Sequence, residues 1–138
     1  MKHSGNVAEY TEERDAALFK CFLLIRNADP SKMVTTCFME AVSMPAPRFF
    51  IGETRAYAVV SALRKGAILN LLSPPRRRMF EEIARRVDIL MKENPSTDLM
   101  QAVVDVINAP APEFYITPGR CCKLIYRQFH RLQRGGRR

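Results

Sequence analysis

The side chains that could perform acid–base, nucleophilic or metal chemistry are few in this chain of 138 residues. Of its two histidines, His3 falls at the N-terminus and His130 in a predicted basic helix, so the sequence assembles no histidine-activated nucleophile. It has no phosphate-binding glycine loop and no Cys-x-x-Cys or His-Glu-x-x-His ligand pattern. Cys121, Cys122 and His130 would diverge around a helix rather than converge on a metal. We therefore expect a protein that is not an enzyme and that has neither a cofactor nor a metal site.

The cysteines are expected to be reduced thiols used in packing. They fall in predicted helices of a chain whose first residues do not form an apolar signal segment, which disfavours a disulfide framework. No apolar run approaches the roughly 18 residues that a membrane span requires. The sequence therefore predicts a cytoplasmic protein with no membrane partner. The cysteines are Cys21, Cys37, Cys121 and Cys122.

Excess positive charge is concentrated in the second half of the chain. Lys and Arg number 22 against 14 acidic residues, which gives a formal net charge of +8. No acidic residue follows Glu113, whereas seven basic residues do. Such an imbalance favours a phosphate-rich or otherwise anionic partner.

One segment of the sequence occurs twice, 65 positions apart. Pro-Ala-Pro-Arg-Phe-Phe-Ile at 45–51 recurs as Pro-Ala-Pro-Glu-Phe-Tyr-Ile at 110–116, and the same offset aligns Arg55 with Arg120. The helical spacing of apolar residues is also preserved at this offset. We interpret this as two copies of one helical unit.

Helix start and stop signals divide each unit into three helices. In the first unit Thr11 is a plausible N-cap and Asp29-Pro30 a stop, and in the second unit Thr117 followed by Pro118 predicts a helix start. The segment 73–75, Ser-Pro-Pro, is expected to be a stiff stop between the units. The predicted helices cover about 12–28, 32–43 and 53 onward in the first unit, and about 79–93, 97–108 and 118 onward in the second.

The sequence therefore predicts an all-α protein. Residues 1–138 would form a single helical domain in which two tandem copies of a helix–helix–(Pro-Ala-Pro-aromatic connector)–helix unit pack with pseudo-two-fold symmetry. The units span approximately 11–66 and 76–134 and are followed by a basic tail at 135–138. The connector aromatics are expected to fill the core between the second and third helices of each unit, with pairing of the two connectors as a short ribbon as the alternative.

The last predicted helix has a basic side and an apolar side. At 100° per residue, five cations fall within an arc of about 80°, while Cys121, Ile125, Phe129 and Leu132 fall on another side. Like charges at this spacing repel each other, which an anionic partner would offset. The five cations are Arg120, Lys123, Arg127, Arg131 and Arg134.

The matching positions of the first unit are mostly small, namely Ala58, Ala62 and Gly66. Small residues in a row let another helix approach closely, so we expect this helix to pack against the other unit or against a second chain in a homo-oligomer. The basic helix would then face outward, toward the partner.

A connector followed by a basic helix resembles the general helix-turn-helix arrangement, although about eight connector residues exceed the usual turn. The resemblance implies duplex DNA as the partner; an acidic protein, met by a helical interaction module, and RNA are the alternatives. We expect base contacts from Arg120, Lys123 and Arg127 near the start of the helix. Phosphate contacts are expected from Arg76, Arg77, Arg78, Arg131, Arg134, Arg137 and Arg138.

Overall fold

The computed structural model describes the backbone of residues 2–136 and the side chains of residues 10–134. Within this part of the chain, all regular secondary structure is helical apart from one isolated pair of extended residues. The prediction of an all-α protein is therefore confirmed. The helices are α1 (Lys2–Ala28), α2 (Val34–Val42), α3 (Glu53–Arg64), α4 (Pro74–Glu93), α5 (Leu99–Ile107) and α6 (Pro118–Gly136).

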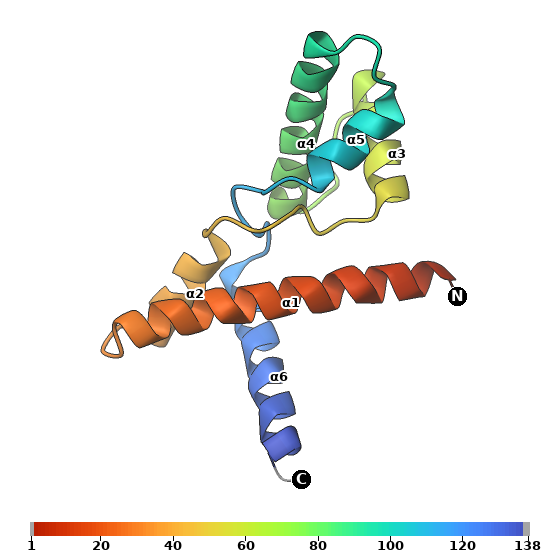
Figure 1. Ribbon diagram of the computed structural model, residues 1–138. Helices are drawn as coiled ribbons and strands as arrows, with labels where there is room; N and C mark the ends of the chain where they lie inside the picture. Colours follow the sequence, from red (N-terminus) through yellow and green to blue (C-terminus); the bar gives the residue numbers. More distant parts are fainter. Residues whose placement is uncertain (1, 137–138) are drawn as a thin grey trace.

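The helices pack in two groups of three, on either side of two extended segments that pass each other (Figure 1). In one group α1, α2 and α6 pack against one another, and in the other α3, α4 and α5 do. The third helix of each predicted unit is therefore packed on the first two helices of the other unit. The sequence left open what α3 would pack against, and the structure places it on α4 and α5.

The resemblance to a helix-turn-helix is wrong for the consecutive helices of this chain. That arrangement requires the second and third helices to pack together across a short turn. Neither α2 and α3 nor α5 and α6 contact each other within the described residues. The reason is that the connectors, residues 43–52 and 108–117, carry the chain from one helix group to the other.

The two connectors pair where they pass each other. Ala46 and Ala111 form an antiparallel bridge in which each backbone N–H donates to the carbonyl of the other at 2.9 Å. The N–H of Phe49 donates to the carbonyl of Ile107 at 3.0 Å, and the N–H of Phe114 to that of Val42 at 3.1 Å. Each connector is thus tied to the end of the second helix of the opposite unit.

Connector aromatics fill the junction between the helix groups, rather than a space between the second and third helices of one unit as predicted. The ring of Phe49 stacks on Tyr115 with centroids 5.9 Å apart, and Phe50 stacks on Phe114 at 6.2 Å. Tyr115 has a φ of 59°. A bulky residue in this left-handed region costs about 1–3 kcal/mol, so the surrounding packing must hold it there.

Two helices begin earlier than predicted. α1 begins at Lys2, because no proline interrupts the segment before Thr11, which lies inside the helix instead of capping it. α4 begins at Pro74 with Ser73 as its N-cap. Proline suits the first helical positions because its φ is already helical and it has no N–H to leave unpaired. The earlier start places three arginines in the first turns of α4, namely Arg76, Arg77 and Arg78.

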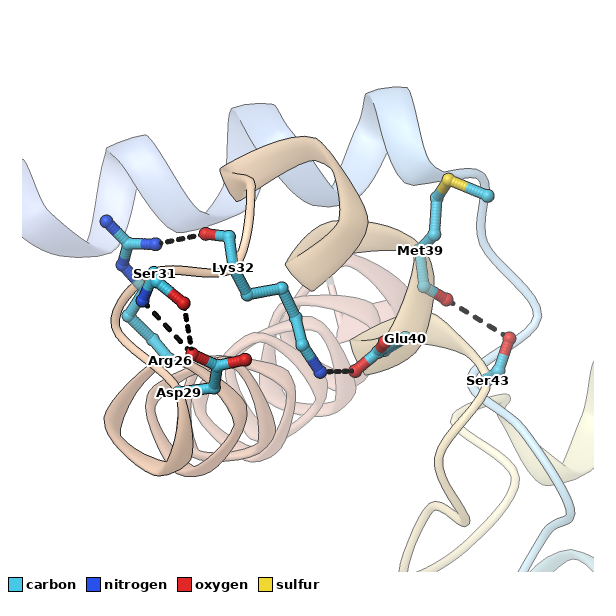
Figure 2. A network of polar contacts seen from close by, with 7 residues as sticks. All are labelled: Arg26, Asp29, Ser31, Lys32, Met39, Glu40 and Ser43. Carbon is cyan, nitrogen blue, oxygen red and sulfur yellow. Dashed lines mark hydrogen bonds and ion pairs between the residues drawn. The ribbon is translucent and has the colours of Figure 1, made fainter.

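The turn between α1 and α2 is held by polar contacts (Figure 2). The carboxylate of Asp29 accepts hydrogen bonds from the hydroxyl of Ser31 at 2.6 Å and from its backbone N–H at 3.2 Å, which lowers the pKa of Asp29. The ammonium of Lys32 donates a hydrogen bond to the carboxylate of Glu40 of α2 at 2.8 Å. The backbone carbonyl of Lys32 accepts a hydrogen bond from the guanidinium of Arg26 of α1 at 2.6 Å. These contacts connect the end of α1 to α2 through the turn.

The four cysteines are free thiols in the structure. Cys37 and Cys121 are buried, and Cys21 and Cys122 are half-buried. Burial raises the pKa of the Cys121 thiol to about 12 and also raises that of Cys21. The folded protein therefore holds the Cys121 proton more tightly than the unfolded chain does, so stability falls as the pH rises from about 9 towards 12.

These environments predict an order of thiol reactivity. We expect a disulfide reagent at pH 8 to modify Cys21 and Cys122 in the folded protein, and Cys37 and Cys121 only after unfolding, because the reaction requires an accessible thiolate. Mass spectrometry of the digested protein measures the four sites separately. Rapid labelling of Cys121 before unfolding would contradict its burial.

Candidate nucleic-acid interface

The start of the basic helix is defined by the residues predicted to cap it. α6 begins at Pro118, and the hydroxyl of Thr117 accepts a hydrogen bond from the backbone N–H of Arg120 at 3.1 Å. This is the geometry of an N-cap, which satisfies a donor that the helix itself leaves free. The predicted start is therefore confirmed.

One side of α6 is buried and the other carries the cations. Cys121, Leu124 and Ile125 are buried, and the ring of Phe129 meets that of Phe19 of α1 edge-on at 5.1 Å. All five predicted cations are exposed, and none forms an ion pair with a described side chain. These residues, the basic face of α6, are Arg120, Lys123, Arg127, Arg131 and Arg134.

Burial of α6 decreases toward its end. Leu132, predicted to lie on the buried side, is 60% exposed. The last turns of α6 extend past α1, so no helix covers them (Figure 1). The end of the helix is thus accessible from several sides, including the apolar one.

The three arginines of α4 lie in different surroundings. Arg78 forms an ion pair with Glu113 at 3.0 Å, and this hydrogen bond raises the pKa of Arg78. Arg77 is half-buried. Arg76 is half-buried with its guanidinium 5.6 Å from the centre of the Phe80 ring. An acid therefore already compensates the charge of Arg78, whereas Arg76 has no such partner among the described residues.

Arg76 and Arg120 line one cavity of about 320 Å³, together with Arg14 of α1. A neighbouring cavity of about 400 Å³ is lined by Arg14, Arg55 and Arg76. Four arginines from α1, α3, α4 and α6 thus surround the junction where the connectors meet. The structure brings together two residues that the sequence proposed as separate contacts.

Sequence reasoning did not select Arg14 or Arg55 as binding residues. A signal for Arg55 existed, because the repeat aligns it with Arg120. No sequence signal marks Arg14, because its place at the junction depends on how α1 lies relative to the connectors in the folded protein. Its guanidinium pairs with the buried Asp15 at 3.1 Å, which compensates its charge in part.

The electrostatics of the junction are dominated by positive charge. No acidic side chain lines either cavity within the described part of the chain. Burial lowers the pKa of Arg76, and the charge of Arg55 lowers it further. Like charges held close together in a partly buried place favour binding of an anion, which would relieve their repulsion.

The other predicted contact residues between 10 and 134 do not line either cavity. The side chains of the basic tail, 135–138, including Arg137 and Arg138, lie outside the described residues. In the predicted row of small residues, Ala58 of α3 and Gly66, which lies past the end of α3, are exposed, and Ala62 of α3 is half-buried. Self-association through this row remains a prediction that sedimentation would test.

Within residues 10–134, no three His, Cys, Asp or Glu side chains lie close enough together to hold a metal ion. None of the described helices combines the length and the apolar character that a membrane span requires. No protein-family model, curated protein sequence or solved structure matches this chain.

Proposed function

We propose that the protein is a non-enzymatic DNA-binding protein that contacts the duplex with the basic face of α6. The observation that carries the proposal is that all five cations of this face are exposed and unpaired with described side chains, while the opposite side of the helix is buried. An α-helix fits the major groove of DNA, and unpaired cations beside it meet phosphates.

The proposed contacts divide by their place on the helix. Arg120, Lys123 and Arg127 lie in the first turns, which is where groove-binding helices contact base edges. Arg131 and Arg134 would contact phosphates. Arg76 of α4, which lines one cavity with Arg120 at the start of α6, would be a further phosphate contact. Arg78 would contribute less, because binding DNA would require it to leave Glu113.

We also infer that the scaffold is a duplicated unit in a single domain, with the third helices exchanged between the copies. Support comes from positions 65 residues apart: α2 and α5, and the starts of α3 and α6, are related by this offset. So are the bridge residues Ala46 and Ala111 and the two connector hydrogen bonds. A unit of about 60 residues buries little core by itself, which favours such an exchange.

An acidic protein is the second candidate partner. It is favoured by exposed apolar side chains of α6 outside the basic face, since Tyr126 is 62% and Leu132 60% exposed. Protein interfaces are enriched in aromatic residues and arginine, whereas phosphates would not use these apolar side chains. RNA is a third candidate, since its backbone offers the same charges.

Salt dependence tests the proposal and separates the candidates. Binding of a labelled 20-base-pair duplex would be measured by fluorescence anisotropy over a series of salt concentrations, with single-stranded RNA and polyglutamate as competitors. If Arg131, Arg134 and Arg76 contact phosphates as proposed, the logarithm of the association constant should fall with the logarithm of salt with a slope of about −3. Affinity unaffected by salt, or a stronger competition by polyglutamate than by unlabelled duplex, would contradict DNA binding.

A further inference from the structure

The two arginine-lined cavities are counterparts of each other. Every wall residue of the Arg55 cavity that lies between residues 10 and 55 has its counterpart, 65 positions later, in the wall of the Arg120 cavity. The cavities share Arg14, Phe50 and Arg76, so they meet at these side chains. These two adjoining cavities, called the paired chamber, have Arg55 in one half, Arg120 in the other and Arg76 in the wall of both.

The paired chamber holds more positive charge than its own acids compensate. Arg14 is paired with Asp15, but Arg55, Arg76 and Arg120 have no ion-pair partner among the described side chains. The chamber walls include the N-cap residues of α3 and α6, Gly52 and Thr117. Helix N-termini add unpaired N–H donors and partial positive charge.

We propose that this paired chamber binds a compact anion with two or more linked phosphate groups, one in each half. Guanidinium groups recognise phosphate oxygens through paired N–H donors, and three uncompensated cations match an anion with about three negative charges. A duplex phosphodiester has one negative charge and lies on a convex backbone, so it fits a chamber less well. The cavity volumes of about 320 and 400 Å³ lie in the roughly 300–1,000 Å³ range of ligand pockets.

The apolar walls strengthen this recognition. The stacked rings of Phe50 and Phe114 both line the Arg120 cavity, and Phe50 also lines the Arg55 cavity. Apolar walls lower the local dielectric, in which each ionic contact becomes stronger than in water. Arg76 and Arg120 also belong to the proposed duplex contacts, whereas Arg55 of α3 does not, so a variant at Arg55 separates binding in the chamber from DNA binding by α6.

Titration calorimetry with inorganic pyrophosphate tests the chamber, with sulfate as the single-group control. We expect wild-type protein to bind pyrophosphate more tightly than sulfate. Arg55→Ala should weaken pyrophosphate binding roughly 10- to 100-fold, because one charged hydrogen-bonding partner is lost. Arg76→Gln, which removes the guanidinium but keeps a polar side chain, should have a similar effect. Arg127→Ala, an exposed arginine two turns beyond the chamber, is the matched control and should leave pyrophosphate binding unchanged.

Competition experiments identify which kind of molecule supplies the phosphate groups. The Arg127→Ala variant separates this proposal from DNA binding. ATP offers the groups on a free nucleotide, and single-stranded RNA with a 5′-triphosphate, compared with the same RNA with a 5′-hydroxyl, offers them on a chain end. Whichever competes with pyrophosphate in wild type but not in Arg55→Ala identifies the source. Pyrophosphate binding that persists in both chamber variants, or is absent from wild type at millimolar concentration, overturns the proposal. Loss of duplex binding in Arg127→Ala with intact pyrophosphate binding would concern α6 alone, and each variant's thermal midpoint shows that it is folded.

Discussion

Replacing Lys123, Arg127 and Arg131 together with alanine is expected to weaken duplex DNA binding by roughly 100- to 1,000-fold at about 0.1 M salt. Arg131 is a proposed phosphate contact, which contributes roughly 0.9 of a decade at this salt concentration, and Lys123 and Arg127 are proposed base contacts that contribute about 1–3 kcal/mol each, so the three together contribute about two decades or more. The slope of binding against salt should become shallower by about 1, because one phosphate contact is lost. Fluorescence anisotropy with the labelled 20-base-pair duplex measures both quantities.

A matched control separates this local effect from that of net charge. Lys20, Lys65 and Lys92 are also exposed, but they lie outside the basic face of α6. Replacing these three with alanine lowers the formal net charge from +8 to +5, as the α6 variant does. We expect the control to lose little affinity and both variants to unfold near the wild-type temperature. Equal losses in the two variants would show that total charge, and not α6, determines binding.

Replacing Phe49 with alanine is expected to lower the free energy of unfolding by about 3–5 kcal/mol, the range for a large aromatic removed from a well-packed core. Phe49 is 1% exposed, stacks on Tyr115 and lies beneath the guanidinium of Arg86 at 5.1 Å. It sits where the two helix groups meet, so the cavity left behind would loosen both. Chemical denaturation followed by circular dichroism measures the loss.

The neighbouring Phe50 provides the control for this prediction. It has the same side chain and also stacks on an aromatic ring, that of Phe114, but it is only half-buried. Phe50→Ala removes less apolar area from contact, so we expect a loss of less than about 2 kcal/mol. A Phe50→Ala loss equal to that of Phe49→Ala would contradict the deeper burial of Phe49 as the cause of the larger loss.

Local sequence signals predicted the starts of helices correctly where the residues at the helix end determine them. Thr117 and Pro118 define the start of α6, and Gly52 precedes α3 as its cap. These local signals failed where the same residues are compatible with two different structures. Ser73-Pro74-Pro75 has the composition of a turn and also of a helix start, and only the packing of α4 against α3 and α5 favours the second.

The candidate site was only partly predictable for a related reason. The basic face of α6 follows from the 3.6-residue period, which any helix imposes on its own sequence. The association of Arg76 with Arg120, and of both with Arg14 and Arg55, depends on residues far apart in the chain. No local pattern encodes such proximity, so these residues could be predicted singly but not as a group.

The sequence by itself determined that this chain is helical, that one segment recurs 65 positions later, and that α6 has a cationic side. Periodicity, capping and composition act over a few residues, and they determine these properties without reference to the rest of the fold. Only the tertiary structure decided that α3 packs on α4 and α5, that α6 packs on α1 and α2, and that four arginines meet between these two helix groups. Which helices pack together depends on which apolar faces come into contact on each side of the crossing connectors. Burial requires proximity in space, and proximity along the chain does not determine it.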